Sequence, residues 1–522
     1  MLPVERYIFY SFHFTFHKKD LLIFVDQNNH TLRPLSLYKN LFKQTAIYGL
    51  ATVLPRMFGF ILVPLYVHYM PEAEYGKSSI IFAWIIFFNV ILSYGMETAF
   101  FRFYNNGSDK KTVIETTTVS IFWTTLGFLV TALLFRNTLA TYTNVDIQYI
   151  TYSIWIITLD ALVIVPFSKL RATGRPMMYA TIKIGNVVVN LLLNLFFIIV
   201  LPKLAKSDPN GFPSSIYFEN FQVGYIFISN IIASLLTFLV LSPSYFHLKW
   251  HFDYALWKKM LRYGLPILVA GIAFAINDQF DKILLGYLLP PDIAEAQTGV
   301  YSACYKLGLF MVLYRTAYTL GIEPFFFSHA SNPNAPQTYA MVTKYFVIFG
   351  SLILVVVIVF ADLFKQFMIP NPSYWEAMKI VPLIILANFF LGIYTNLSVW
   401  YKLIDKTYIG AYISIVGAMV TLVLNYLLIP TMSYYGSAIA TLAAYGTMML
   451  ISYLLGNKYY PIPYDIKKIG GYLVLSIVLS CVSFYRYREN YYIGIPLILV
   501  FVYFIYYNEK ETLNRIIKRK NN

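Results

Sequence analysis

Long apolar runs without a single charge recur along the chain. Three of them are VSIFWTTLGFLVTALLF at 119–135, YFVIFGSLILVVVIVFA at 345–361 and YYIGIPLILVFVYFIYY at 491–507. Each approaches the roughly 20 residues that cross the hydrocarbon core of a bilayer as a helix. Lipid cannot form hydrogen bonds with exposed backbone groups, so such spans fold as helices. The sequence therefore predicts an all-α, polytopic membrane protein.

Runs of this kind indicate about fourteen transmembrane helices. We expect them near 43–68, 78–103, 117–136, 148–168, 178–201, 221–243, 262–289, 298–328, 343–362, 379–401, 407–430, 434–456, 469–486 and 491–507. The composition agrees, because 12% of the residues are charged, against about 25% in an ordinary soluble protein.

The basic residues follow the predicted topology. The formal net charge is +15 at pH 7, and such basicity alone would also suit nucleic-acid binding. With the N-terminus inside, however, Lys and Arg gather in alternate loops and in the tail RIIKRK, as the positive-inside rule describes for cytoplasmic segments. We therefore expect both termini in the cytoplasm and no nucleic-acid partner.

Signals for catalysis or metal binding are missing from the sequence. The two cysteines, Cys304 and Cys481, lie in different predicted spans and form no CxxC pair. The chain has no Walker sequence, no HExxH and no GxSxG in a suitable context. We expect no metal, no cofactor and no catalytic residue.

A short motif is present twice. GMETAFFRF begins at Gly95, and GIEPFFFSH begins 226 residues later at Gly321. This offset aligns Glu97 with Glu323, and it also aligns the basic residues Arg56 and Lys282. The two copies predict a duplicated architecture of six helices each. Because six is even, both copies enter the membrane in the same direction, which makes them parallel repeats.

These features predict five segments along the chain. They are an N-terminal extension (1–38), an N-lobe with helices 1–6 (39–245), a C-lobe with helices 7–12 (246–457), helices 13–14 (458–508) and a basic cytoplasmic tail (509–522). Within the extension, YIFYSFHFTFH is too short to span a bilayer and has no signal-peptide cleavage site. We interpret residues 1–36 as a peripheral, disordered or spurious extension.

Ionisable residues concentrate in predicted spans one, two, seven and eight. Arg56 lies near the middle of the first span, where a charge costs about 2.5–3.5 kcal/mol on insertion scales and has to face protein or water. Asp278 and Lys282 have the i, i+4 spacing of an intrahelical pair. Arg315 and Glu323 lie on one face of span eight, which favours a water-filled cavity.

Other charged residues have simpler interpretations. Arg102 and Lys306 are expected to extend their charged ends toward the membrane surface. Asp160 and Lys183, in spans four and five, are predicted to form an interhelical ion pair that stabilises the first lobe.

Several stretches resemble a known family. LFKQTAIYGLATVLPRMFGFILVPLYVHYMPEAEYG at 41–76, FDKILLGYLL and GVYSACYKLGLF within 280–310, and VLNYLLIP with YGSAIATLAAYG within 423–446 are similar to bacterial Wzx-type polysaccharide flippases. These belong to the multidrug/oligosaccharidyl-lipid/polysaccharide exporter superfamily. The resemblance covers about 38–508. It implies two six-helix lobes around a central cavity lined by spans one, two, seven and eight.

The resemblance also implies a function and its partners. Family members move a polyprenyl-diphosphate-linked oligosaccharide from the inner to the outer leaflet of the bacterial cytoplasmic membrane, for O-antigen, capsule or exopolysaccharide synthesis. Expected partners are this lipid-linked oligosaccharide, membrane lipids, a polysaccharide polymerase and glycosyltransferases, with the chain itself a monomer. Two additional helices form a groove for the lipid tail in some relatives, and spans thirteen and fourteen would correspond to them.

Physical chemistry then suggests roles for the charged residues. A diphosphate needs cationic partners in a low-dielectric region, and Arg and Lys supply them. We assign Arg56, Lys282 and Arg315 to substrate binding. Three acidic residues are assigned to ion coupling or gating: Glu97, Asp278 and Glu323.

Three alternative functions remain open. An ion-coupled multidrug exporter would favour an acidic cavity, whereas the four charge-bearing spans contain both signs. A peptidoglycan lipid-precursor flippase would bind the same diphosphate. A membrane glycosyltransferase or polymerase would ordinarily need a long outer loop, and the loops here are short.

Overall fold

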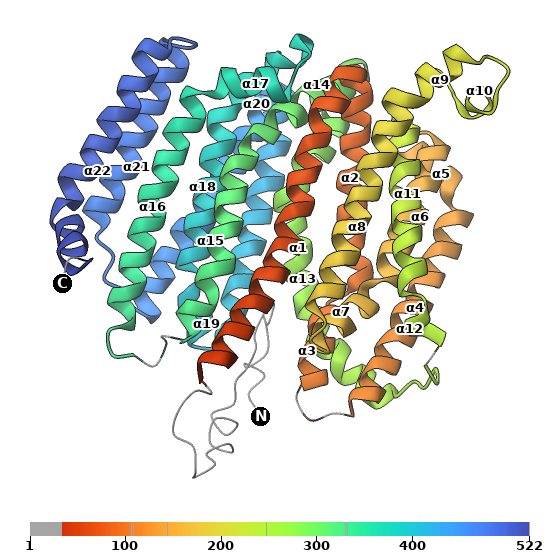
Figure 1. Ribbon diagram of the computed structural model, residues 1–522, viewed down its shortest axis with the longest axis horizontal. Coiled ribbons are helices and arrows are strands. Elements are labelled where there is room, and N and C mark those ends of the chain that lie inside the picture. Colours follow the sequence, from red (N-terminus) through yellow and green to blue (C-terminus); the bar gives the residue numbers. More distant parts are fainter. Residues whose placement is uncertain are drawn as a thin grey trace. The chain divides into compact units, whose positions relative to one another are not determined.

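The computed structural model describes residues 34–520 apart from 106, 108, 144, 247, 329 and 331. Every element in this described part of the chain is a helix, which confirms the predicted all-α fold (Figure 1). Residues 1–33, which hold most of the predicted extension, lie outside the described residues.

The helices of the first half of the chain are α1 Pro34–Tyr69, α2 Glu72–Ser93, α3 Met96–Asn105, α4 Lys110–Leu134, α5 Arg136–Thr143, α6 Ile147–Leu162, α7 Ile164–Ala172, α8 Pro176–Leu195, the π-helical turn η1 Phe196–Val200, α9 Leu201–Ser207, α10 Phe212–Ile216, α11 Gln222–Leu241 and α12 Pro243–Phe246. Those of the second half are α13 Tyr254–Leu288, α14 Pro291–Tyr305, the 3₁₀ turn η2 Lys306–Gly308, α15 Leu309–Ser328, α16 Ala335–Val359, α17 Ala361–Met368, the 3₁₀ segment η3 Pro372–Ile380, α18 Val381–Leu397, α19 Val399–Leu403, α20 Tyr408–Tyr459, α21 Ile466–Cys481, the π-helical turn η4 Val482–Arg486 and α22 Tyr491–Lys520.

Among the described residues, twelve helical stretches are long and apolar enough to cross a membrane. The chain is therefore a multi-pass membrane protein, although the number differs from the predicted fourteen. Predicted spans 407–430 and 434–456 both lie in α20, which is interrupted at Ser433 (φ 51°, ψ −138°), three residues after Pro430. Predicted span 298–328 is divided by η2 between α14 and α15 and is not among the twelve.

Contacts divide the described chain into two compact units. The first consists of the described parts of Met1–Phe58, Phe88–Phe196 and Gly224–Gly271, and the second of Gly59–Phe87, Phe197–Val223 and the described parts of Ile272–Asn522. This division cuts through α1, α2, η1, α11 and α13. The predicted lobes, 39–245 and 246–457, rest on the sequence repeat and remain a prediction.

In the first unit, α3 and α13 pack at very short range. Gly95 has a left-handed backbone (φ +72°), and a Cβ atom there would lie 2.2 Å from the carbonyl oxygen of Gly264. Gly95 therefore serves both the turn between α2 and α3 and the close approach to α13. Gly321, its predicted counterpart, has neither feature, so the repeated motif does not repeat this local geometry.

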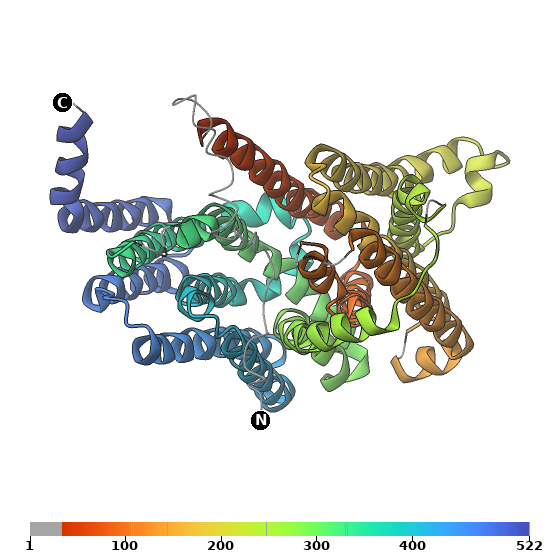
Figure 2. The same cartoon turned by 90° about the horizontal axis from the view of Figure 1, so that it is seen from below.

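The second unit has a large apolar core around α18. Buried residues of α16, α18 and η3 form one continuous cluster, which includes Phe346, Tyr374 and Phe389. Gly350 of α16 lies against the Phe389 ring, because a Cβ atom there would approach the ring to 2.2 Å. Helices α16 and α21 lie side by side (Figures 1 and 2), so the two C-terminal helices extend this core.

Candidate functional site

Two of the predicted site residues have side chains outside the described residues. Arg56 lies in α1, within the first unit, and Glu323 lies in α15, within the second. The backbone places Arg56 in a helix that is long and apolar enough to cross a membrane, whereas α15, which carries Glu323, is not among the twelve such stretches of the described chain. The roles of both residues remain predictions.

Lys282 is buried in the second unit and forms an ion pair. Its ammonium Nζ lies 2.9 Å from Oδ1 of Asp281 and 3.2 Å from Oδ2, and it also lies 4.6 Å from the ring centroid of Tyr305. The Tyr301 hydroxyl donates a 2.7 Å hydrogen bond to Oδ2 of Asp281. Asp281 is 2% exposed and Lys282 7% exposed. The positive charge is thus neutralised within the protein.

The intrahelical ion pair that the spacing of Asp278 and Lys282 suggested does not form in this structure. Lys282 turns to its chain neighbour Asp281, whose carboxylate also accepts a hydrogen bond from the backbone N–H of Lys282 at 2.8 Å. The carboxylate of Asp278 instead accepts from the amide of Gln279. Asp281 is preferred because the Tyr301 hydroxyl already positions its carboxylate beside the ammonium group.

Arg315 is half-buried on α15, facing α18. Its Cγ atom lies 3.5 Å from the position that a Cβ on Gly392 would occupy. One turn along α15, the hydroxyl of Thr319 donates to the carbonyl oxygen of Arg315. The side of α15 that carries Thr319 contributes to a narrow pocket.

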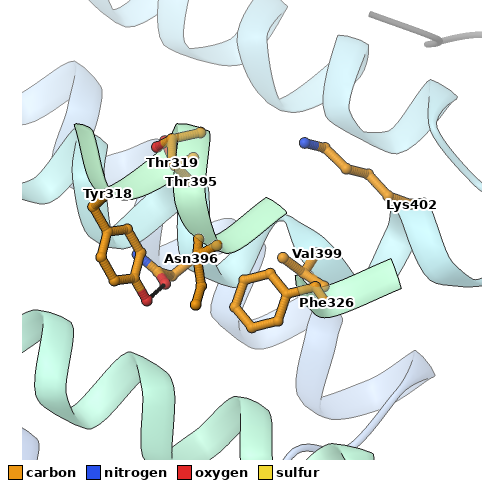
Figure 3. Close-up of a pocket in the computed structure, with 8 residues that line it drawn as sticks. Tyr318, Thr319, Phe326, Thr395, Asn396, Val399 and Lys402 are labelled. Carbon is orange, nitrogen blue, oxygen red and sulfur yellow. Dashed lines mark hydrogen bonds between the residues drawn. The ribbon is translucent and has the colours of Figure 1, made fainter. Parts of the chain in front are cut away.

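This pocket lies between α15, α18 and α19 of the second unit (Figure 3). Within it, the Tyr318 hydroxyl donates a 2.9 Å hydrogen bond to Oδ1 of Asn396. The Lys402 side chain extends toward Thr319 and Thr395 (Figure 3). The volume is about 10 Å³, which is room for about one water molecule. A sugar or a diphosphate does not fit this pocket in the conformation described.

Glu97 is paired in the first unit. Its Oε1 lies 2.7 Å from Nη1 of Arg171, and the Glu97 side chain is 49% exposed. The Arg171 guanidinium also lies over the rings of Phe101 and Tyr179, at 4.7 and 5.9 Å from their centroids. The sequence did not predict this pair, because 74 residues separate its members.

Asp160 and Lys183 line one cavity of the first unit, but they do not form the predicted direct ion pair. No N–O distance of 4.0 Å or less joins them in this described part of the chain. The Asp160 carboxylate instead accepts from the Asn89 amide at 3.2 Å and from the Ser234 hydroxyl at 3.0 Å. The cavity volume is about 60 Å³, enough for a few water molecules.

A charged cluster that the sequence did not indicate joins α17 to the segment before α22. Asp362 accepts from Nε and Nη2 of Arg488 at 2.9 and 2.8 Å, and from Lys365 at 2.6 Å. Burial by itself would raise the pKa of Asp362, but the hydrogen bonds from Arg488 and Lys365 outweigh burial and hold it below its usual value. The hydrogen bonds that Arg488 donates to Asp362 likewise raise the pKa of Arg488.

A second ion pair attaches α22 to α16. Lys344 lies 2.7 Å from Oε2 of Glu509, and Glu509 is 4% exposed. The Tyr472 hydroxyl of α21 donates to the same carboxylate at 3.3 Å. Glu509 opens the predicted tail 509–522, so the helix and its packing continue past the predicted end of the last span.

No group of three or more His, Cys, Asp or Glu side chains that could hold a metal ion occurs among the residues that the structure describes.

Comparisons with known proteins agree on a family and a fold. The family model described as "Polysaccharide biosynthesis protein" matches residues 41–328, more than half of the chain. The solved structure of the lipid II flippase MurJ in its inward closed conformation is 16% identical with a TM-score of 0.67, and the match covers 89% of this chain and 99% of that one. No curated protein sequence matches.

Multidrug transporters share the fold as well. An inward-facing multidrug resistance MATE family transporter is 14% identical with a TM-score of 0.59, covering 82% of this chain and 96% of its own. A mutant of the Vibrio cholerae MATE transporter VcmN is 18% identical with a TM-score of 0.54, covering 81% and 97%. At these identities the likeness concerns the fold.

Proposed function

Because the chain belongs to the polysaccharide biosynthesis protein family, within the multidrug/oligosaccharidyl-lipid/polysaccharide exporter superfamily, we propose that it is a flippase for polyprenyl-diphosphate-linked oligosaccharides. It would move this lipid from the inner to the outer leaflet of the bacterial cytoplasmic membrane by alternating access, for surface polysaccharide synthesis. We place both termini in the cytoplasm and treat the monomer as the functional form. A polymerase and glycosyltransferases would act on the same carrier lipid.

The match to the family model carries this proposal. All three residues proposed to bind the diphosphate, Arg56, Lys282 and Arg315, lie within the matched residues 41–328. Cationic side chains in membrane helices are costly unless they serve a pathway or a partner. An anionic diphosphate is a partner of matching charge, and Arg can bind it with two parallel hydrogen bonds.

The described contacts refine two of the proposed roles. Lys282 would have to exchange Asp281 for a phosphate oxygen, since its ammonium group is already neutralised. Glu97 would act in gating through its bond to Arg171, which can break and re-form at a half-exposed position. Asp278 and Glu323 stay candidates for ion coupling.

Leaflet exchange in liposomes tests the proposal. A fluorescent polyprenyl-diphosphate oligosaccharide is added, and its exchange is compared for the wild type, Arg56→Ala and Arg136→Ala. Arg136 is an exposed residue at the start of α5, so its variant controls for loss of one positive charge. We expect exchange with the wild type and the control and none with Arg56→Ala. Exchange at the wild-type rate with Arg56→Ala would remove Arg56 from the site.

The shared fold of MurJ and the MATE transporters favours two alternative candidates. Transport of a peptidoglycan lipid precursor or of a cationic drug would use the same architecture. The same liposomes therefore receive lipid II or a cationic dye in parallel. Movement of the dye without movement of the oligosaccharide would replace the flippase proposal with drug export.

A further inference from the structure

The segment that leads from α12 into α13 is fixed to the side of α4. The backbone N–H of Lys249 donates to Oε1 of Glu115 at 3.3 Å. The backbone N–H of Asp253 donates to the Thr116 hydroxyl at 3.2 Å. We call residues 248–262 the connecting segment. These bonds give it a defined place beside α4, at the end of the first unit where α12 and α4 lie together (Figure 1).

Aromatic contacts place the connecting segment at the level where α4 enters the membrane. The indole N–H of Trp257 donates to the Ser120 hydroxyl at 2.8 Å. The ring centroid of Trp250 lies 5.0 Å from that of Phe122, in an edge-to-face contact. Predicted span 117–136 begins just before these two α4 residues. Both indole groups therefore lie near the boundary between hydrocarbon and water, where Trp is enriched in membrane proteins.

Other aromatic side chains at this level are exposed. Phe252 is 39% exposed and Tyr254 63% exposed, and Phe246, at the end of α12, is 82% exposed. Water solvates rings of this size poorly, whereas the zone between acyl chains and headgroups accommodates them. The exposed rings thus suit contact with a lipid surface.

The connecting segment is also basic. Its exposed cations are Lys249, Lys258, Lys259 and Arg262. The nearby acidic residues are engaged in holding the segment. Glu115 is 4% exposed and accepts from the segment's backbone, and Asp253 accepts a 2.9 Å hydrogen bond from the backbone N–H of Leu256. The outward charge of the segment is therefore positive.

We propose that the connecting segment is a binding surface for anionic phospholipids of the cytoplasmic leaflet. Its aromatic rings lie between the lipid headgroups, and its Lys and Arg side chains contact the phosphates. Anionic lipids attract basic residues that lie within a Debye length of the membrane surface. The depth of the two indole groups favours lipid over a soluble acidic protein. The inference goes beyond the proposed flippase function, because it concerns a lipid of the surrounding membrane and not the transported one.

Spin-labelled lipids test the preference for anionic headgroups. Purified full-length protein is reconstituted in phosphatidylcholine vesicles with a trace of spin-labelled phosphatidylglycerol or spin-labelled phosphatidylcholine. Electron paramagnetic resonance then gives the fraction of each label that the protein immobilises. We expect the wild type to prefer phosphatidylglycerol and Lys258→Gln/Lys259→Gln to lose about half of this preference.

A matched control removes two other exposed cations. Lys203→Gln/Lys206→Gln lowers the net charge by the same amount and should keep the preference of the wild type. An equal loss in both double variants would show that net charge alone attracts the lipid, and a preference unchanged in Lys258→Gln/Lys259→Gln would remove the connecting segment as its source. Either result overturns the proposal.

The depth of a nitroxide label tests the lipid contact separately. The label is attached to Tyr254→Cys or, as the reference for water, to Asn105→Cys at the exposed end of α3. Both variants also carry Cys481→Ser, because Cys481 is exposed whereas Cys304 is buried. We expect the label at 254 to collide more with oxygen, which dissolves in the membrane, than with a water-soluble nickel complex. Collisions like those at 105 would place the segment in water and assign it to a soluble acidic partner instead. Both measurements are independent of transport, so failure of the flippase proposal would leave them unaffected.

Discussion

Asp281 and Lys282 are neighbours in the chain and partners in space, and both are buried. Removal of one partner leaves an uncompensated charge and typically costs about 3–5 kcal/mol, whereas replacement of both by apolar residues is often neutral. We expect Lys282→Met to lower the melting temperature clearly and the double variant Asp281→Leu/Lys282→Met to restore most of the loss. Thermal unfolding in lipid nanodiscs measures both, with exposed Lys258→Met as the control.

The same variants separate two roles of Lys282. If its charge contacts the diphosphate, the double variant regains stability but still fails to exchange the fluorescent oligosaccharide lipid. Exchange at the wild-type rate by the double variant would show that Lys282 serves packing alone, and the substrate-binding assignment would fall to Arg56 and Arg315.

At the scale of helices, α2 and α14 meet through two glycines. A Cβ atom on Gly76 would lie 1.8 Å from the carbonyl oxygen of Glu295, and one on Gly299 would lie 1.9 Å from that of Glu72. The backbones have to separate to admit a methyl group. We expect Gly76→Ala to reduce the free energy of unfolding by about 1–3 kcal/mol, measured by thermal unfolding.

A matched control exists on α4. Gly127 lies inside this helix, and a Cβ atom added there would have no neighbouring atom within 4 Å. Gly127→Ala should therefore be neutral or stabilise by up to about 1 kcal/mol through helix propensity. Equal effects of the two substitutions would contradict the close packing of α2 against α14.

The ion cluster of Asp362 predicts a pH dependence for the attachment of α21 and α22. Its lowered pKa means that the bond to Arg488 stabilises the fold above the unfolded-state pKa of about 3.9 and is lost as the pH falls through the folded-state value. We expect a loss of about 1 kcal/mol below that range, since Arg488 is 38% exposed and solvent screens part of the attraction. The protection factors of the backbone amides in α21 and α22, obtained by hydrogen exchange at pH 7 and pH 3, measure this loss.

Asp362→Asn supplies the comparison. This variant should show lower protection factors than the wild type in α21 and α22 at pH 7. Its protection factors should change little between pH 7 and pH 3. A wild type whose exchange protection in these helices is the same at both pH values would contradict the predicted role of the cluster.

Helix positions could be predicted from the sequence far better than side-chain partners. Lipid forces apolar runs into helices, so most spans could be identified from composition alone. The interruption of α20 at Ser433 is a change in backbone dihedral angles, and the apolar sequence on either side of Ser433 does not indicate it. The Glu97–Arg171 pair depends on packing between segments 74 residues apart. Lys282 forms its ion pair with Asp281 and not with Asp278, because Asp281 is held in place by a hydrogen bond from Tyr301, a residue on another helix.

At the scale of the whole molecule, the proposed transport moves net charge across the membrane. A negative potential of 100 mV favours outward movement of one negative charge by about 2.3 kcal/mol, or roughly fifty-fold in the ratio between leaflets.

A potassium diffusion potential across proteoliposomes checks this expectation. Valinomycin sets the potential, and the labelled diphosphate lipid is quantified in each leaflet by quenching from outside. We expect the lipid to accumulate on the positive side with the wild type and to stay evenly distributed with Arg56→Ala or without protein. An even distribution with active wild type would mean that a compensating cation travels with the diphosphate, so that transport is electroneutral. Accumulation would instead establish that the anion crosses the membrane with its charge uncompensated.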